Sequence, residues 1–482
     1  MENYKELIKE KSFVNGEWVS ENDTDYIDVK NPADNSIVGK VNNNTAVLVK
    51  KAIDAAHNAM PKWKSLSAKE RSSILYKWYS LIQEHKEDIA YIMTLESGKP
   101  IGESRGEVDY GSSFIQWFSE EAKRVNGDVI PGFTSDKRIA VIKQPIGVVG
   151  AITPWNFPLA MITRKVAPAL AAGCSVVIRP SEETPLTALA ISQLAKDAGF
   201  PDGVYNTVVG LDASAMGIAL CESEKVAKIS FTGSTRVGQI LMAQSASTLK
   251  KLSLELGGNA PFIVFEDADI DLAVKGAIAG KFRFGGQTCV CVNRILVHEN
   301  IYESFTDKFV EAVNTLKVGN GLDDKTNIGP LINQKAIDKV EGFVKDGLEK
   351  GGVLLTGGKL MDGLFYGPTV IGNATANMRF AKEEIFGPVA PLFKFKSDEE
   401  AVAMANDTIY GLASYFYTND LNRTIKVSEA LEYGIVGVNE GLISSEMVPF
   451  GGVKYSGEGR EGSKYGIEDY VEIKYVCLGN VK

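Results

Sequence analysis

A cysteine preceded by two glycines is the side chain with the clearest chemical potential in this sequence. Gly285-Gly286-Gln287-Thr288-Cys289 stands between an expected helix and an expected strand, where glycines allow a sharp turn that exposes the next side chain. A thiol there becomes a nucleophile if backbone N–H groups or a cation lower its pKa. Cysteine is also a common small buried hydrophobe, so position alone leaves both interpretations open.

Histidine and metal chemistry have little material in this chain. Its three histidines, His57, His85 and His298, are widely separated and lack metal-ligand spacing, which argues against zinc hydrolysis and Ser-His-Asp catalysis. We therefore expect no metal site. Five cysteines in 482 residues are an odd, sparse set, which argues against a secreted disulfide scaffold and indicates a reducing cytoplasm.

Charge and hydropathy exclude further classes of protein. A formal net charge of -9 disfavours nucleic acid or an anionic membrane as the partner, because both would repel the chain. Residues 1–13 contain no apolar run and do not form a signal peptide. The most apolar stretch, residues 167–178, is too short to span a bilayer.

Short apolar runs alternate with helical patterns from residue 138 onward. The first series comprises 139–152 (extended), 160–172 (helix), 175–178 (strand), 186–198 (helix), 205–209 (strand), 214–221 (helix), 228–231 (strand), 236–244 (helix) and 251–254 (strand). The second comprises a strand near Phe262, a helix over 270–284, a strand over 293–298 and a helix over 302–316. This alternation predicts the α/β class, with two tandem open α/β lobes.

Two segments fit neither series. They are residues 123–143 and the tail 469–477, which alternates as a half-buried strand does. A solitary terminal strand needs a partner, and we expect a neighbouring subunit to supply it.

Five motifs resemble signatures of the aldehyde dehydrogenase superfamily. In family order and roughly at family spacing, they are PWNFP at 154–158, FTGST at 231–235, ELGGNAP at 255–261, GQTC at 286–289 and EIFGP at 384–388. The resemblance covers nearly the whole chain and is strongest to the succinate-semialdehyde dehydrogenase branch. It implies three parts, namely a Rossmann-like cofactor domain (1–122 and 146–255), a catalytic domain (256–446) and a small β oligomerisation element (123–145 and 447–482).

The resemblance implies catalytic roles for three residues. Cys289 attacks the aldehyde and carries a thioester, the Asn156 amide and the Cys289 backbone N–H stabilise the oxyanion, and Glu255 is the base for hydrolysis. Asn156 can instead cap the following helix. Glu255 can instead be a surface residue before a Gly-Gly turn, although its place after an apolar run favours burial.

Contacts with the phosphates and nicotinamide of a dinucleotide are implied as well. Gly233 and Ser234 follow an expected strand and open an expected helix, which is a suitable place for a pyrophosphate. The motif is neither Gly-x-Gly-x-x-Gly nor a P-loop, and read alone it is a bare turn. By the same resemblance, Trp155, Glu384 and Phe386 also contact the cofactor.

Arg179, Ser181 and Glu182 resemble the adenosine-ribose site of the family. Most relatives carry Lys at the position of Arg179, so we expect that contact to persist with altered geometry. Glu182 can accept hydrogen bonds from ribose hydroxyls but would repel a 2′-phosphate. We therefore expect NAD to be favoured, with NADP possible.

Two arginines and a serine point to an acidic substrate. Arg164 and Arg283 flank the motifs of Asn156 and Cys289, and a guanidinium presents a fork that matches a carboxylate. These arginines and Ser444 match the succinate-semialdehyde dehydrogenase branch, which implies succinate semialdehyde as substrate. Each arginine can instead cap a helix or pair with an acid, and glutarate semialdehyde or another short aldehyde is the alternative substrate.

Two residues near Cys289 complicate this interpretation. Cys291 lies two residues further on, so a reversible disulfide could block the nucleophile under oxidants; a packing role is the equal alternative. Phe284 replaces an Asn common in relatives, which affects the expected rate and chain-length preference more than the reaction class.

Competing functions remain open on the sequence alone. A non-catalytic protein on the same fold is opposed by the presence of Cys289, Glu255 and Asn156. A cofactor-free cysteine hydrolase is opposed by the implied cofactor contacts. We expect a homodimer or homotetramer that acts on a small semialdehyde, with neither nucleic acid nor membrane as partner.

Overall fold

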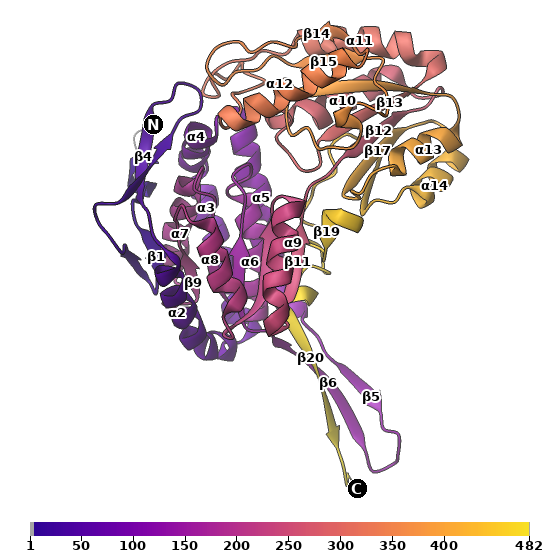
Figure 1. Cartoon of the computed structure of the whole chain (residues 1–482). Coiled ribbons are helices and arrows are strands. Elements are labelled where there is room, and N and C mark those ends of the chain that lie inside the picture. The colour runs from indigo at the N-terminus through magenta and orange to yellow at the C-terminus, as the bar shows by residue number, and fades with distance from the viewer. Residues whose placement is uncertain (1–3, 482) are drawn as a thin grey trace.

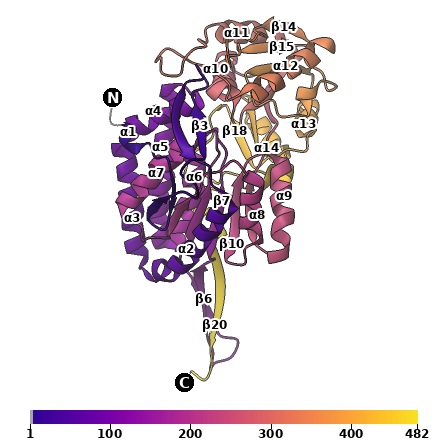
Figure 2. The same cartoon turned by 60° about the vertical axis from the view of Figure 1, so that its left-hand side comes forward.

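The computed structural model describes residues 4–481 and has two lobes with a narrow projection (Figure 1). The second lobe and the projection lie at opposite ends of the first lobe in both views (Figure 2). The α/β class is confirmed, because within the described residues the strands form two large sheets of eight and seven strands.

The first lobe is built on a sheet with the strand order β19-β11-β10-β7-β8-β9-β1-β2. Strands β7 to β11 run parallel, and the remaining strands pair antiparallel at the edges. The strands are β1 (Ser12–Val14), β2 (Glu17–Val19), β7 (Val148–Ile152), β8 (Ser175–Arg179), β9 (Tyr205–Thr207), β10 (Val226–Thr232), β11 (Lys251–Glu255) and β19 (Gly457–Glu458).

The described part of the first lobe also contains nine α-helices and a separate two-stranded antiparallel sheet of β3 (Tyr26–Lys30) and β4 (Ile37–Asn42). The helices are α1 (Tyr4–Leu7), α2 (Ala46–Ser65), α3 (Ala68–Glu84), α4 (Lys86–Ser97), α5 (Ile101–Glu121), α6 (Ala160–Ala172), α7 (Pro185–Ala198), α8 (Ala213–Glu222) and α9 (Thr235–Ser245).

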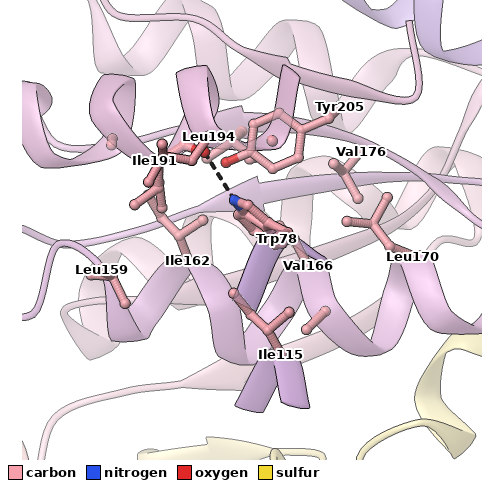
Figure 3. Close-up of a cluster of buried hydrophobic side chains, with 14 of the residues drawn as sticks. Trp78, Ile115, Leu159, Ile162, Val166, Leu170, Val176, Ile191, Leu194 and Tyr205 are labelled. Carbon is pink, nitrogen blue, oxygen red and sulfur yellow. Dashed lines mark hydrogen bonds between the residues drawn. The ribbon is translucent and has the colours of Figure 1, made fainter. Parts of the chain in front are cut away.

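The sheet of the first lobe is apolar on both faces. Val176 and Ile178 of β8 belong to one buried cluster, whereas Val177 between them belongs to another. This is the period of two expected for a strand covered on both sides. In the first cluster Trp78 packs among side chains of α5, α6 and α7, and its Nε1 donates to the carbonyl of Ile191 at 3.0 Å (Figure 3).

The second lobe is built on a sheet with the order β14-β15-β16-β13-β12-β17-β18. Only β14, among the strands described in this sheet, pairs antiparallel. The elements are β12 (Ala260–Val264), α10 (Ile270–Phe282), β13 (Val292–His298), α11 (Tyr302–Asn314), α12 (Gln334–Glu349), β14 (Val353–Thr356), β15 (Thr369–Gly372), β16 (Val389–Phe395), α13 (Asp398–Asn406), β17 (Ala413–Tyr417), α14 (Leu421–Ala430) and β18 (Ile435–Val438).

The projection is a small antiparallel sheet of β5 (Asp128–Pro131), β6 (Arg138–Pro145) and β20 (Val471–Leu478). The expectation that the terminal strand needs a neighbouring subunit was wrong on this point. β20 pairs with β6 of its own chain along its full length, from Val471↔Pro145 to Leu478↔Arg138. Two segments that each lacked a partner in the sequence pattern thus pair with each other.

The expected helices and strands are present, with two departures. The extended run expected over 139–152 is divided between β6 and β7, which belong to different sheets. The helix expected over 270–284 ends at Phe282, and a 3-10 segment over Arg283–Gly286 follows. The sequence predicted helix at Phe284 because its side chain is apolar. In the structure Phe284 instead has φ 48° and ψ 40°, a left-handed conformation that a bulky side chain rarely adopts. Within residues 4–481, no helix has the length and apolarity needed to cross a bilayer.

Candidate functional site

A cavity of about 260 Å³ lies between the lobes, where two strand ends of the first sheet diverge. The chain order of the sheet reverses between β7 and β10, and ligands of open α/β sheets bind at the carboxyl ends of strands at such a switch point. The cavity is lined by Pro154, Trp155, Asn156, Phe157, Met161, Thr232, Gly233, Ser234, Leu256, Gly257, Cys289, Lys339, Glu384 and Phe386.

The cysteine turn is built from left-handed residues. Phe284, Gly285 and Gly286 have φ values of 48°, 59° and 76° in succession. A Cβ on Gly286 would lie 2.3 Å from the carbonyl oxygen of Gly387, so the turn requires glycine there. The turn brings Cys289 into the cavity wall.

The surroundings of the Cys289 thiol favour its protonated form. Burial raises its pKa to about 12, and the guanidinium of Arg164 opposes this effect. The negative charges of Glu255 and Glu384 raise the pKa further, and Arg283 lowers it. A thiolate at neutral pH therefore requires a base or a cation beyond those that face the sulfur in the resting site.

Asn156 lies in the turn between β7 and α6 and is 5% exposed. Its Nδ2 donates to the backbone carbonyl of Gln287 at 2.9 Å, two residues before Cys289. The expected amide donor and the expected nucleophile therefore line one cavity, with the amide directed at the cysteine turn.

Glu255 ends β11 and is buried, as the apolar run before it suggested. Its Oε2 has no hydrogen-bond partner among the described residues. Burial raises the pKa of this carboxyl well above its ordinary value, the charge of Glu461 raises it further, and Arg164 and Lys165 oppose the shift. A buried carboxyl without a partner is suited to accept a proton from water.

The expected phosphate contacts lie at the start of α9. Ser234 is the N-cap of this helix, and its Oγ accepts from the backbone N–H of Val237 at 3.4 Å. A Cβ on Gly233 would lie 2.4 Å from the ring of Phe231, so this close approach requires glycine. Gly233 and Ser234 line the cavity at the start of a helix, which is a place that suits the phosphates of a dinucleotide.

The residues expected to contact the adenosine ribose lie near one another at the end of β8. Arg179 Nη2 contacts Glu182 Oε2 at 2.7 Å and also donates to the carbonyl of Gly210 at 3.2 Å. Ser181 Oγ accepts from the backbone N–H of Glu183 at 3.3 Å. Glu182 is thus paired with Arg179, a contact that sequence reasoning did not foresee.

The expected nicotinamide residues line the opposite wall. Glu384 accepts from the backbone N–H of Gly258 at 3.0 Å. Burial raises the pKa of Glu384, and Lys339, which also lines the cavity, opposes this effect. The rings of Trp155 and Phe386 lie edge to face, with centroids 5.7 Å apart.

Arg283 and Ser444 line a second, smaller hollow together with Thr288 and Tyr415. Arg164 lies beside it on α6, 2% exposed, with Nη2 2.7 Å from Glu461 and its guanidinium 3.9 Å from the centre of the Phe450 ring. Both arginines are close enough to Cys289 to lower the pKa of its thiol. Arg164 and Arg283 therefore lie near the nucleophile, and Ser444 shares the smaller hollow with Arg283.

Cys291 follows the nucleophile but has different contacts. Its Sγ lies 3.4 Å from the carbonyls of Lys281 and Val292 and 3.5 Å from the Lys281 ammonium. Burial raises the pKa of the Cys291 thiol, and the charge of Lys281 opposes this effect. The two cysteines are unpaired in this structure, and the disulfide between them stays a prediction.

Several site residues were missed by sequence reasoning. Tyr110 of α5 lies 3.5 Å from Arg164 through its hydroxyl, and Glu461 contacts both Arg164 and Lys165. Although burial opposes it, Lys165 and Arg164 hold the pKa of Glu461 below its ordinary value. Because Glu461 is nearly 300 positions further along the chain than these two cations, no local spacing could have indicated the contact.

Metal ligands do not cluster in the part of the chain that the structure describes. Among residues 4–481, no three His, Cys, Asp or Glu side chains form a group that could hold a metal ion. The groups that line the cavity and can move a proton or stabilise charge are the thiol, carboxyl, amide and ammonium groups of its own side chains.

Comparisons with known proteins agree with this arrangement. The model of the aldehyde dehydrogenase family matches residues 18–476. The NADP(+) succinate-semialdehyde dehydrogenase GabD of Escherichia coli K12 is 55% identical over 479 residues, 99% of each chain. A glutarate-semialdehyde dehydrogenase of Pseudomonas putida is 54% identical over 473 residues, 98% of each. A crystal structure of an E. coli NADP-dependent enzyme has a TM-score of 0.97 at 55% identity, covering 98% of this chain and 99% of that one.

Proposed function

Because this chain belongs to the aldehyde dehydrogenase family, we propose that it oxidises succinate semialdehyde to succinate through a thioester on Cys289. The reaction class, NAD(P)+-dependent oxidation of an aldehyde, follows from the family. The substrate and the roles of the individual residues are our proposal.

In the first chemical step the Cys289 thiol loses its proton to water, and its sulfur bonds to the aldehyde carbon as the C=O π bond breaks. The carbonyl oxygen then carries a negative charge, for which the Asn156 amide and the backbone N–H of Cys289 are the donors. The cavity that both residues line supports this assignment. Removing such a donor costs on the order of 10²–10³ in rate.

The second step is hydrolysis of the thioester by water. Glu255 removes the proton from that water, and its burial and unpartnered Oε2 support this role. When bound, NAD(P)+ accepts the hydride that leaves the tetrahedral intermediate between the two steps.

We propose that Gly233 and Ser234 would hold the phosphates of the cofactor at the start of α9. Arg179, Ser181 and Glu182 would hold its adenosine ribose, and Trp155, Glu384 and Phe386 its nicotinamide end. We infer a preference for NAD, because a 2′-phosphate would meet the Glu182 carboxylate. The ratio of kcat/KM for NAD+ and NADP+ tests this inference: Glu182→Ser should move it toward NADP+, and an unchanged ratio would contradict it.

The arginines around the nucleophile carry the substrate assignment. Arg283 and Ser444 line one hollow beside Cys289, and Arg164 is buried at its side, so a short aldehyde bound to the sulfur can extend a carboxylate toward them. A guanidinium pairs with a carboxylate through two parallel hydrogen bonds.

A substrate series tests this assignment. Arg283→Ala should reduce kcat/KM for succinate semialdehyde far more than for neutral butanal, because only the former carries the charge. Equal losses on both aldehydes would refute the carboxylate pocket. Cys289→Ala should abolish NAD(P)H formation with either aldehyde, and retained activity would exclude Cys289 as nucleophile.

Glutarate semialdehyde is the second candidate, because one relative with 54% identity is named for it. It is one methylene longer, and a methylene in a pocket is worth only about 1–3 kcal/mol. Comparing kcat/KM on the four- and five-carbon semialdehydes decides which is the better substrate.

We also propose that the chain assembles into a homodimer or homotetramer in the cytoplasm. The projection of β5, β6 and β20 exposes apolar side chains, which supports assembly through this sheet. The cysteines described in the structure form no disulfide, which is consistent with a reducing compartment.

A further inference from the structure

A buried lysine outside the proposed catalytic set lies behind the Asn156 turn. Lys99 stands between α4 and α5, and its side chain and that of Glu107 are both fully buried and paired. The ammonium also donates to the backbone carbonyl of Asn156 at 2.8 Å. It lies 3.8 Å from the centre of the Phe157 ring.

Glu107 secures the other end of the same turn. Its Oε2 pairs with Lys99, while its Oε1 accepts from the backbone N–H groups of Leu159 and Ala160, at 3.0 and 3.2 Å. These N–H groups open α6, a helix whose N-cap residue, Leu159, has no capping side chain of its own. A carboxylate of α5 therefore caps α6 from outside.

The pair thus holds residues 156–160 at both ends. Residues 153–158 form no helix or strand, so no ladder of backbone hydrogen bonds fixes the direction of the Asn156 side chain. The Lys99 ammonium also lies 4.5 Å from the centre of the Phe284 ring at the start of the cysteine turn. One cation therefore contacts both turns that supply the proposed oxyanion donors.

The energetics do not favour a purely stabilising role for this pair. Burial lowers the pKa of Lys99, and the charge of Glu107 opposes that effect. Replacing a buried ion pair by apolar residues of similar volume is often neutral or stabilising, so burial of these charges alone is weak evidence for a structural purpose.

We propose that Lys99, with Glu107, is a positioning residue that fixes the Asn156 amide against the oxygen of the carbonyl group whose carbon Cys289 attacks. This inference rests on the proposed function. A donor stabilises an oxyanion only if it is in place before the charge develops, and a displacement of about 1 Å can cost about 10²-fold in rate.

The test uses a reaction of Cys289 that needs no cofactor. p-Nitrophenyl acetate acylates a thiol through a tetrahedral oxyanion, whereas iodoacetamide alkylates it without one. Lys99→Met should lower the acylation rate constant by about 10- to 100-fold. Alkylation of Cys289, followed on its own peptide by mass spectrometry, should change by no more than about twofold.

A double-mutant cycle separates positioning from simple destabilisation. In an Asn156→Ala background, Lys99→Met should cause little further loss of acylation, because the donor it positions is already absent. The same loss in both backgrounds would overturn the proposal, as would an unchanged acylation rate in Lys99→Met or an equal fall in alkylation.

Two further variants complete the design. Lys228→Met is the matched control, since Lys228 is also buried, donates to Ser253 Oγ at 2.6 Å and is not among the residues that line the cavity. It should lower the thermal midpoint without changing acylation.

Glu107→Gln, which breaks the ion pair, should show the same non-additivity with Asn156→Ala if Lys99→Met fails to fold. If Asn156→Ala itself leaves acylation unchanged, the oxyanion role in the proposed function fails instead.

Discussion

At the scale of single residues, burial controls the protonation of the two reacting groups. It raises the pKa of Glu255 well above the ordinary value and that of Cys289 to about 12. A carboxyl with a raised pKa keeps its proton at pH values where an ordinary glutamate has lost it. The basic form of Glu255 therefore accumulates only as the pH rises beyond the ordinary range.

This shift gives the hydrolysis step a predicted pH dependence. Decay of the acetyl-enzyme formed with p-nitrophenyl acetate should accelerate with pH well above ~4.3, the ordinary glutamate pKa. Glu255→Gln should slow the decay by about 10²- to 10⁴-fold and remove this dependence, while acetylation of Cys289 continues. Mass spectrometry of the intact protein measures both. If the variant keeps the wild-type pH profile, another group is the base.

Cys291 provides a separate prediction for oxidants. Both thiols have raised pKa values, so we expect oxidation by mild peroxide to be slow and to end in a disulfide between Cys289 and Cys291. A thiol reductant should restore activity in the wild type. In Cys291→Ser the loss should become irreversible, because Cys289 has no neighbouring thiol to protect it. Equal recovery in both proteins would contradict a regulatory disulfide.

At the scale of elements, the cysteine turn offers a matched pair of glycines. A Cβ on Gly286 would meet backbone at 2.3 Å, whereas one on Gly285 would find its nearest neighbour, Ile328 Cγ2, at 3.6 Å. Gly285→Ala should therefore cost only about 1–2 kcal/mol of backbone strain. Gly286→Ala should destabilise more and also displace Cys289. Thermal midpoints and iodoacetamide kinetics compare the two, and similar effects would show that strain alone sets the cost.

The alternation of elements could be predicted because each strand and helix has a local apolar pattern. Val176 to Ile178 are continuously apolar because β8 is covered on both faces. Helix α5 was not foreseen as a wall of the site. Its Glu107 is buried and its Tyr110 lies against Arg164, yet polar residues at helical spacing resemble a solvent-exposed face. Only their remote partners explain their burial.

Backbone conformation that depends on remote contacts could not be predicted from the sequence either. The two glycines predicted a turn before Cys289, but Phe284 gave no sign of its positive φ. Its backbone N–H donates to the Glu103 carboxylate at 2.8 Å, a contact from the other lobe. The order of the motifs along the sequence located the proposed catalytic residues. The side chains that fix their backbone, such as Glu103, come from distant segments that carry no recognisable motif.

At the scale of the whole molecule, the site combines residues from both lobes of one chain. Strand ends of the first lobe supply Asn156 and Ser234, and the second lobe supplies Cys289 and Glu384. Because both lobes of the same chain supply the proposed catalytic residues, we expect assembly and cysteine chemistry to be separable.

The projection is the place to test that separation. Ile473 and Tyr475 of β20 are 70% and 58% exposed in the single chain, and Val129 of β5 is 88% exposed. Apolar surface at a sheet edge favours pairing with another copy.

Ile473→Lys combined with Tyr475→Lys should shift sedimentation velocity to a smaller species, because burying two charges at the interface is costly. Lys474→Ala, on the opposite face of β20, is the control and should keep the wild-type assembly. The smaller species should still be acetylated at Cys289 by p-nitrophenyl acetate. An unchanged sedimentation coefficient would place the interface elsewhere, and loss of acetylation in a folded smaller species would mean that the cysteine turn depends on the neighbouring subunit.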